Sequence, residues 1–440
     1  MPKLLDNVKT VAFYTLGCKV NQYDTEAMLS IFEKEGYKVV GFDETADVYV
    51  INTCTVTNLS DRKSRQAIRK AKHQNADSIV IVAGCYAQTS PEEVAGIPGV
   101  NLVIGNKDRN EIIRFIKEIE AGKSQINVVE NIMKVRDFEE LRIDEYKGHT
   151  RAFLKIQEGC SQFCAYCIIP YARGPVRSRL PGDVIDEVKR LADNGFKEVV
   201  LTGIHIASYG RDLKDITLLE LIERIHEIEG IERIRLGSLE PKTITPEFVE
   251  RIKPLNKLCP HYHISLQSGC DETLKRMNRK YTTEEYMNVV KLLRENIKDV
   301  ALTTDVMTGF PGETEEEFQK TCSFLEKVKF MKMHIFKFSP RKGTPAASYK
   351  DQVTPENKEQ RSRVLLDMSE RLSLEFNKQY LGRTMPVLFE QEVKGREGYY
   401  EGLTANYIQV LCRADESLKG KISAARLTDA TADGITGIIE

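Results

Sequence analysis

Three cysteines stand close together in residues 159–167, which read Gly-Cys-Ser-Gln-Phe-Cys-Ala-Tyr-Cys. This segment directly follows an apolar run at residues 152–156 that we expect to be a buried strand. Thiolates repel one another, so Cys160, Cys164 and Cys167 can converge only around a positive centre such as zinc or an iron-sulfur cluster. The chain therefore has to fold so that this loop surrounds a metal centre.

The spacing of the three cysteines indicates a centre with an open position. A structural zinc site and an ordinary four-iron cluster each take four protein ligands, whereas this loop supplies three. With the aromatic Tyr166 before the last cysteine, the loop resembles that of the radical S-adenosylmethionine (SAM) superfamily, whose open iron binds the amino and carboxylate groups of SAM. A zinc knuckle completed by a distant His or Cys is the alternative, although such knuckles usually show paired Cys-x2-Cys spacings.

Length and composition are those of a globular protein with about two to four domains, since the chain has 440 residues, of which 41% are hydrophobic and 29% charged. The N-terminus has no apolar run behind a basic start, and nowhere do 18 apolar residues follow one another. We therefore expect neither a signal peptide nor a membrane span. Ten cysteines without a secretion signal indicate reduced, partly metal-bound thiols in the cytoplasm.

Residues 1–121 are expected to form an α/β domain with a flavodoxin-like parallel sheet, because short apolar runs alternate with amphipathic segments. The expected strands are residues 10–16, 48–51, 78–83 and 102–104, with a weaker one at 37–40, and the expected helices are 24–34, 60–73 and 109–120. Residues 122–150 are more polar and are expected to be a linker with at most a short strand near Val128.

A second set of three cysteines belongs to this first domain. Cys18, Cys54 and Cys85 each stand just after the C-terminal end of an expected strand. In an open parallel sheet those ends share one edge, where ligands bind. Free cysteines are often buried in the core, but core cysteines would lie inside the strands rather than at their exits. We therefore expect a second metal site with three thiolate ligands.

Residues 151–375 continue with six βα units, which predicts a partial (β/α)6 barrel. The expected strands are residues 152–156, 198–201, 233–236, 262–266, 301–306 and 334–338, and the expected helices lie near 183–194, 218–228, 246–252, 283–295 and 315–328. Catalytic loops of such barrels gather at the C-terminal ends of the strands. Cys160 follows the first strand, as this rule requires.

Other strand exits carry residues suited to a ligand. A glycine lets the backbone approach a ligand closely, while hydroxyl, amide and carboxylate groups can hold a ribose or an amino acid moiety. Together with Tyr166, the candidates for cofactor binding are Thr202, Gly203, Ser238, Glu240, Gln267, Asp305 and Gly309. His205 is either a further site residue or a hydrogen-bonded loop histidine. The remaining cysteines give weaker signals: Cys322 lies on an apolar helix face, and Cys259 and Cys412 lack metal-like neighbours. Cys270 follows a strand exit, but a single extra thiol is weak evidence for a site.

A long helix expected at residues 358–380 leads into short segments broken by glycines, which predicts a small antiparallel β-barrel over residues 376–440. Small barrels of this kind often bind RNA. The charge balance does not support that role, since this segment has 8 Lys and Arg against 9 Asp and Glu and the whole chain has a net charge of −1. Basic residues do cluster locally, at Arg62, Lys63, Arg65, Arg69, Lys70 and Lys72, and again at Arg173, Arg177 and Arg179. The first group is a candidate RNA contact because it lies near Cys54, and is otherwise a solvated helix face.

Two three-cysteine sites, a radical SAM barrel and a terminal β-barrel resemble the methylthiotransferase family along nearly the whole chain. Residues 15–26, Thr-Leu-Gly-Cys-Lys-Val-Asn-Gln-Tyr-Asp-Thr-Glu, look like the group that acts on N6-threonylcarbamoyladenosine at position 37 of tRNA, and so do residues 51–57 and 155–160. The isopentenyladenosine enzymes and the ribosomal-protein aspartate enzymes carry different residues after the first cysteine.

The resemblance implies two 4Fe-4S clusters, SAM, and a TRAM-like RNA-binding barrel at the C-terminus. The C2–H of adenine is neither acidic nor electrophilic, so a radical has to abstract its hydrogen. The cluster on Cys160, Cys164 and Cys167 would cleave SAM to that radical, and the cluster on the earlier cysteines would present a methylated sulfur. The implied partners are a tRNA anticodon loop and an electron donor of flavodoxin or ferredoxin type. The same chemistry on isopentenyladenosine or on a ribosomal-protein aspartate, and a zinc-dependent RNA-binding protein without catalysis, are the alternatives.

Overall fold

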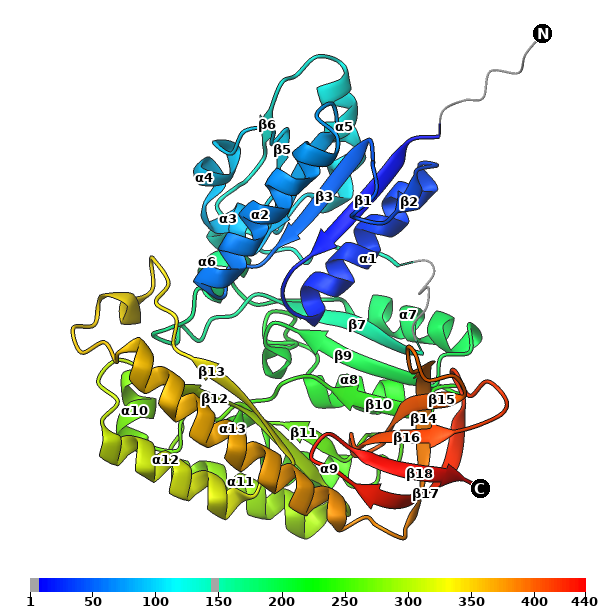
Figure 1. The fold of residues 1–440 in the computed structure, drawn as a ribbon, viewed down its shortest axis with the longest axis vertical. Helices are drawn as coiled ribbons and strands as arrows, with labels where there is room; N and C mark the ends of the chain where they lie inside the picture. Colours follow the sequence, from blue (N-terminus) through cyan, green and yellow to red (C-terminus); the bar gives the residue numbers. More distant parts are fainter. Residues whose placement is uncertain (1–7, 144–149) are drawn as a thin grey trace.

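The computed structural model of the chain describes residues 8–143 and 150–440. An N-terminal α/β part, a curled central sheet with helices outside it, and a C-terminal β-barrel follow one another along the chain (Figure 1). The predicted fold class is thereby confirmed. None of the helices in the described part of the chain combines the length and apolar character needed to cross a bilayer.

The N-terminal sheet is parallel throughout, with the strand order β2-β1-β3-β4-β5-β6. Its strands are β1 (Thr10–Thr15), β2 (Lys38–Val40), β3 (Val48–Thr53), β4 (Ile79–Gly84), β5 (Leu102–Val103) and β6 (Ile126–Asn127). Successive residues of β3 show why both faces are covered: Val48 and Val50 face one hydrophobic cluster, and Tyr49 and Ile51 the other. The segment predicted as a linker thus contributes the last strand of the sheet.

Helices cover both faces of this sheet. One face packs against α1 (Lys19–Lys34) and α5 (Ile112–Glu120), which follows the short helix η1 (Arg109–Glu111). The other face packs against α2 (Asn58–Gln74), α3 (Cys85–Thr89) and α4 (Pro91–Ala95). Helix α1 begins directly after Cys18, whereas a start at residue 24 was predicted, and α3 and α4 were not predicted. A further short helix, η2 (Ile132–Lys134), lies in the following segment.

The central part contains the six predicted parallel strands. They are β7 (Arg151–Glu158), β9 (Glu198–Gly203), β10 (Arg233–Leu236), β11 (His261–His263), β12 (Ala301–Thr308) and β13 (Lys332–Lys337). The edge strand β8 (Arg177–Ser178) runs antiparallel to β7. Two sheets, β10-β9-β7-β8 and β11-β12-β13, are joined by single parallel bridges, including Leu239 to Ile264, so the strands form one curved wall.

The helices of the central part lie outside this wall (Figure 1). The predicted ones are α7 (Pro181–Asp193), α8 (Leu218–His226), α9 (Pro246–Ile252), α11 (Thr283–Asn296) and α12 (Glu315–Val328), and the short ones that were not predicted are α6 (Ile169–Arg173), α10 (Asp271–Arg276), η3 (Ile206–Ser208), η4 (Pro241–Thr243) and η5 (Pro345–Ser348). Thr314 and Glu317 form a capping box at the start of α12.

Helix α13 (Pro355–Lys378) leads to the C-terminal barrel, whose strands are β14 (Thr384–Glu392), β15 (Tyr399–Thr404), β16 (Gln409–Arg413), β17 (Ile422–Ala430) and β18 (Ile435–Ile439). The barrel is closed in the order β14-β15-β16-β18-β17. It is not wholly antiparallel as predicted, because β16 and β18 pair in parallel. Five strands in a ring cannot all alternate in direction, so closure requires such a pair.

The C-terminal barrel docks on the N-terminal ends of the central strands. Arg233 on β10 donates hydrogen bonds to the carbonyls of Leu403, at 2.8 Å, and Pro386, at 2.9 Å. Tyr407 in the β15–β16 turn stacks on the ring of His261 with 4.4 Å between centroids. The barrel therefore closes the end of the curved sheet opposite to the cysteine loop.

Candidate active site

The cysteine loop after β7 is held in place by its own backbone. Gly159 has φ +74°, and a Cβ atom at this position would lie 1.9 Å from the carbonyl oxygen of Pro175, so a larger residue does not fit. The N–H of Ala165 donates to the carbonyl of Met277 at 2.9 Å. The loop is thus constrained at Gly159, before the first cysteine, and held at Ala165, between the second and the third.

The three thiols of this loop suit a cationic centre. Burial raises the pKa of Cys160 to about 11, and burial together with the neighbouring Cys164 raises that of Cys167 to about 12. The Arg279 guanidinium lies against Cys164, with Nη1 3.3 Å from its sulfur. Neutral thiols held this close become thiolates readily only when a metal supplies positive charge, so the donor set fits a cluster.

Arg279 also connects the cysteine loop with Glu240. Its Nη2 atom lies 3.2 Å from Glu240 Oε1, while Gln162 of the loop donates to Glu240 Oε2 at 3.0 Å. His205 Nε2 lies 3.3 Å from the same oxygen. Burial opposes ionisation, but His205 and Arg279 hold the pKa of Glu240 below its usual value. Glu240 is therefore an anchored carboxylate beside the loop, and His205 is the hydrogen-bonded loop histidine of the second interpretation, since Ser208 Oγ lies 2.6 Å from its Nδ1.

The second set of cysteines lies at the C-terminal edge of the N-terminal sheet, after the neighbouring strands β1, β3 and β4. Cys54 and Cys85 are buried, and Cys18 is exposed to a cavity described below. Burial and the nearby Cys85 and Cys18 thiols raise the pKa of Cys54 to about 11. Gly17 packs against this cysteine, because a Cβ atom at Gly17 would lie 3.2 Å from the Cys54 sulfur.

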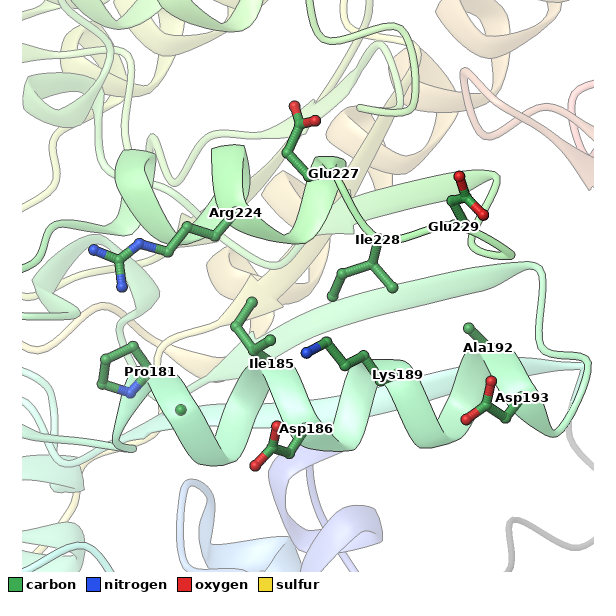
Figure 2. Close-up of a pocket in the computed structure, with 11 residues that line it drawn as sticks. Pro181, Ile185, Asp186, Lys189, Ala192, Asp193, Arg224, Glu227, Ile228 and Glu229 are labelled. Carbon is green, nitrogen blue, oxygen red and sulfur yellow. The ribbon is translucent and has the colours of Figure 1, made fainter.

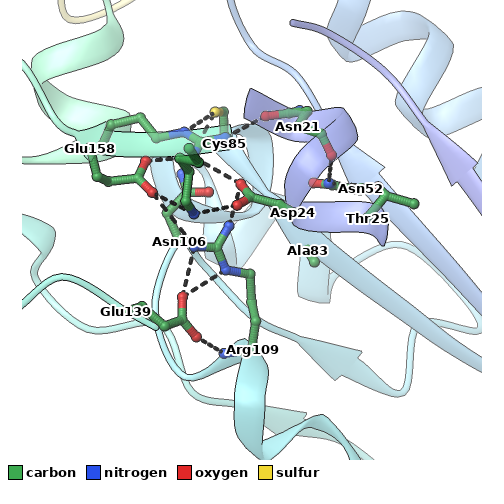
Figure 3. Close-up of polar contacts among 12 residues, drawn as sticks. Asn21, Asp24, Thr25, Asn52, Ala83, Cys85, Asn106, Arg109, Glu139 and Glu158 are labelled. Carbon is green, nitrogen blue, oxygen red and sulfur yellow. Dashed lines mark hydrogen bonds and ion pairs between the residues drawn. The ribbon is translucent and has the colours of Figure 1, made fainter. Parts of the chain in front are cut away.

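Arg173 contacts the N-terminal thiol site and the strand that leads into the cysteine loop; Figure 3 labels its partners Cys85, Asp24 and Glu158. Arg173 lies at the end of α6, directly after the cysteine loop, and donates from Nε to the sulfur of Cys85 at 3.2 Å. Its Nη1 atom contacts Asp24 on α1 at 3.0 Å and Glu158 on β7 at 2.5 Å. One buried guanidinium thus contacts the N-terminal thiol site and the strand that precedes Cys160.

Further charges balance this buried network. Arg109 Nη1 and Lys155 Nζ each lie 2.5 Å from an oxygen of Asp24, and Lys155 lies 3.2 Å from Glu158. Although both carboxylates are fully buried, the surrounding Arg109, Lys155 and Arg173 hold the pKa values of Asp24 and Glu158 below their usual range. Arg109 also pairs with Glu139 at 2.7 Å.

The basic residues predicted near the two cysteine sets have different environments. Arg173, Arg177 and Arg179 are buried, and Arg179 pairs with Glu187 at 2.6 Å, so this group is internal. On α2, partners within the chain bind Arg65, Lys70 and Lys72, whereas Arg62, Lys63 and Arg69 are exposed.

A cavity of about 400 Å³ connects the N-terminal part with the inside of the curved sheet. Cys18 and Lys19 line it from α1, and Tyr407 lines it from the C-terminal barrel. Four of the predicted cofactor-binding residues line it from the central strands, namely Thr202, Gly203, Ser238 and Asp305. The C-terminal strand ends and the N-terminal thiol site therefore share one space.

The other predicted cofactor-binding residues do not line this cavity. Tyr166 packs edge-on against Phe310 with 6.4 Å between ring centroids. Gln267 has φ +70° and continues the sheet beside Val306. The N–H of Gly309 donates to Glu313 at 2.7 Å and is thus already bonded.

The sequence did not predict the contacts that Arg173 and Arg279 make with the thiol sites, nor the place of Lys19 in the cavity. Lys19 was visible only as the residue after Cys18, Arg173 only as a member of a basic cluster, and Arg279 carries no motif. The remaining cysteines behave differently: Cys322 belongs to the central core, as predicted, and Cys259, Cys270 and Cys412 are buried. Within residues 8–143 and 150–440, no three His, Cys, Asp or Glu side chains are placed to hold a single metal ion.

A larger groove, of about 680 Å³, lies between α7 and α8, on the outside of the central curved sheet (Figure 2). Ile185 and Lys189 face it from α7, and Arg224 and Ile228 from the end of α8. None of the predicted site residues lines it, so it is separate from the thiol sites.

Two family models match the chain: the radical SAM superfamily over residues 154–325, and the uncharacterized protein family UPF0004 over residues 10–105. A threonylcarbamoyladenosine tRNA methylthiotransferase, MtaB, of Bacillus subtilis is 46% identical over 96% of this chain and 94% of its own length. The chain belongs to the radical SAM methylthiotransferase family. Membership implies SAM and a 4Fe-4S cluster.

The names of two further relatives state different substrates. MtaB of Aquifex aeolicus is 42% identical over 91% of this chain and 96% of its own length. A tRNA-2-methylthio-N(6)-dimethylallyladenosine synthase of Pelotomaculum thermopropionicum is 35% identical over 98% of both chains. Among solved structures, the radical SAM methyltransferase TsrM of Kitasatospora setae has a TM-score of 0.56 at 17% identity and covers 77% of this chain and 74% of its own. That likeness concerns the fold alone.

Proposed function

We propose that this enzyme converts N6-threonylcarbamoyladenosine at position 37 of tRNA into its 2-methylthio derivative by radical SAM chemistry. The observation that carries the proposal is that Cys18 and the strand ends of the central curved sheet line one cavity. Arg173 in addition connects Cys85 with the strand that precedes the cysteine loop. The 46% identity to the Bacillus subtilis enzyme supports this substrate over that of the dimethylallyladenosine relative at 35%.

In this proposal the two cysteine sets have different tasks. Cys160, Cys164 and Cys167 hold one 4Fe-4S cluster, and the N-terminal set holds a second, which provides the sulfur. When bound, the first cluster supplies the electron that cleaves SAM, which is needed because adenine C2–H is neither acidic nor electrophilic. The chain's own side chains compensate the thiolate charge, with Arg279 at Cys164 and Arg173 at Cys85. Such hydrogen bonds to ligating sulfurs tune reduction potentials.

SAM binding is assigned in this proposal to the predicted strand-end residues. Thr202, Gly203, Ser238 and Asp305 line the cavity beside Cys18. Tyr166 belongs to the cysteine loop itself, Glu240 contacts the loop through Gln162, and Gln267 and Gly309 follow β11 and β12. The protein positions the reacting groups and excludes water from the radical.

The proposed partners are a tRNA anticodon loop and an electron donor of flavodoxin or ferredoxin type, in the cytoplasm. The exposed Arg62, Lys63 and Arg69 on α2 and the TRAM-like C-terminal barrel are the proposed RNA contacts. Both lie next to the cavity-bearing part of the molecule, with α2 directly after Cys54.

Mass spectrometry of tRNA nucleosides from a deletion strain tests the proposal. We expect the 2-methylthio derivative of threonylcarbamoyladenosine to disappear and its precursor to accumulate, and a plasmid copy to restore the product. Unchanged levels of that derivative would refute the substrate, and loss of the 2-methylthio isopentenyl derivative instead would assign the second candidate. Anaerobically reconstituted protein should contain about eight irons and eight sulfides per chain. Colourless protein with stoichiometric zinc would refute the chemistry.

A further inference from the structure

The cavity beside Cys18 carries an excess of positive charge. Its cationic side chains are Lys19, Arg235 and Lys332. His261, His263 and His334 also line it, and burial lowers the pKa of His261 and His334, which favours their neutral form. Asp305 is the one carboxylate among the described residues that line it. A space of this kind inside a protein favours an anionic group on its ligand.

Carboxylates compensate part of this positive charge, but the ammonium groups of two lysines have no carboxylate partner among the described residues. Arg235 binds Glu198 at 2.7 Å, and Asp305 lies 3.2 Å from His263 Nε2. In the parts of the chain that the structure describes, Lys19 and Lys332 make no ion pair; Lys19 Nζ lies 5.3 Å from the ring centroid of Phe153. Both lysines are exposed, so their ammonium groups are accessible to an anionic group that enters the cavity.

The place of Lys19 matters as much as its charge. It is the first residue of α1 and directly follows Cys18, a thiol of the proposed sulfur-donating site. The sulfur has to reach C2 of the adenine, and the threonylcarbamoyl group hangs from C6, which only N1 separates from C2. A base that turns C2 toward Cys18 therefore brings its N6 substituent, with its terminal carboxylate, into the same cavity.

We infer that Lys19, assisted by Lys332, binds the carboxylate of the N6-threonylcarbamoyl group and thereby selects this base over adenosines whose N6 substituent is apolar or absent. The inference rests on the proposed function and names the part of the substrate that is recognised. Lys19 is a specificity-determining residue in this account, not a participant in the reaction. SAM also carries a carboxylate, and RNA carries phosphates, so the test has to separate these three anions.

The test compares two anticodon stem–loop RNAs that differ only in the anion. One carries threonylcarbamoyladenosine at position 37, and the other carries its methyl ester, which lacks the charge. Binding to the anaerobically reconstituted enzyme is measured by fluorescence anisotropy at fixed ionic strength, and SAM cleavage is measured without RNA. The variants are Lys19→Gln, Lys19→Arg and Lys332→Gln, with Lys34→Gln at the other end of α1 as the matched control.

We expect the wild-type enzyme to prefer the acid over the ester by about 10-fold or more, the effect of a hydrogen bond to a charged group. Lys19→Gln should bring this ratio close to one, Lys332→Gln should reduce it, and Lys19→Arg and Lys34→Gln should keep it. Iron content of each variant shows whether both clusters still form, so a folding defect does not imitate the result.

Four results would overturn the inference. A full preference for the acid in Lys19→Gln would show that another group reads the carboxylate. An equal loss of affinity for both RNAs would assign Lys19 to a phosphate, and lost SAM cleavage in a fully loaded variant would assign it to SAM. A wild-type enzyme that modifies neither RNA would refute the proposed function itself, and the inference with it.

Discussion

Replacing Arg173 by methionine tests whether the buried ion network joins the N-terminal and central parts. Arg173 is fully buried and contacts Asp24 at 3.0 Å and Glu158 at 2.5 Å. Methionine keeps most of the packing volume but removes the positive charge. The two buried carboxylates must then share the remaining cations, Arg109 and Lys155.

The expected loss of stability follows from these contacts. Removing one partner of a buried ion pair costs about 3–5 kcal/mol because the other charge stays buried without compensation. Here compensation remains, since Arg109 Nη1 and Lys155 Nζ both lie 2.5 Å from Asp24. We therefore expect the unfolding free energy at pH 7 to fall by about 3 kcal/mol, the lower end of that range.

The pH dependence gives the sharper test of this reasoning. In the wild type, the folded-state pKa values of Asp24 and Glu158 lie below their ordinary 3.8 and 4.5, so the stability that they contribute is fully present above that range and is lost only below it. Without the Arg173 guanidinium, burial raises both pKa values. The folded variant then takes up a proton as the pH falls from 7 toward 4.5, which offsets part of its loss. The difference between the two proteins should shrink over this interval.

Urea unfolding followed by far-UV circular dichroism measures this difference at several pH values; the chain has no tryptophan to serve as a fluorescent probe. Arg371→Met is the matched control, because Arg371 forms exposed ion pairs with Glu326 and Glu375 that contribute little. A loss that stays constant between pH 7 and pH 4.5 would show that packing, and not charge, is the cause. That result would refute the electrostatic account.

Other predictions concern the sites themselves. Cys160→Ala should abolish SAM cleavage, while Cys18→Ala should keep cleavage but lose methylthiolation; equal cleavage by Cys160→Ala and the wild type would contradict this division of tasks. Gly159→Ala should reduce the iron content from about eight to about four per chain, since its Cβ would meet a carbonyl oxygen at 1.9 Å, whereas Gly182→Ala, which meets no atom within 4 Å, should keep it. Tyr407→Ala should loosen the C-terminal barrel, because its stacking on a histidine ring at 4.4 Å is lost, and limited proteolysis near residue 380 should accelerate. Unchanged cleavage there would contradict the docking role.

The strands and the strand-end cysteines could be predicted because they depend on local pattern. Apolar runs of a parallel sheet are continuous, and the residue after each run lies at a known edge. The start of α1 was predicted wrongly for a physical reason. Asp24 followed by Thr-Glu resembles a helix start, but it lies in the middle of α1, buried where Arg109 and Arg173 compensate its charge. Helices α3 and α6 have five residues each, too few to show a helical period.

The residues that surround the thiols could not be predicted, because their partners are distant in sequence. Arg279 reaches Cys164 across 115 residues, and Arg173 reaches Cys85 across 88. The group Arg173, Arg177 and Arg179 has the same sequence pattern as an exposed RNA-binding patch. Only the buried acidic partners distinguish the two environments, and those partners come from other elements.

The same ion network holds the N-terminal part against the central part, and each of these parts carries one of the two thiol sites. Glu158 ends β7, two residues before Cys160, and binds Arg173, which in turn donates to Cys85 in the N-terminal part. A shift of helix α6 would withdraw the Arg173 guanidinium from Cys85, Asp24 and Glu158, and only Arg109 and Lys155 would then compensate the two buried carboxylates. The electrostatic cost of separating Arg173 from its partners thus stabilises the placement of the N-terminal thiol site relative to the cysteine loop. Chemistry that needs both sites at one base depends on this placement.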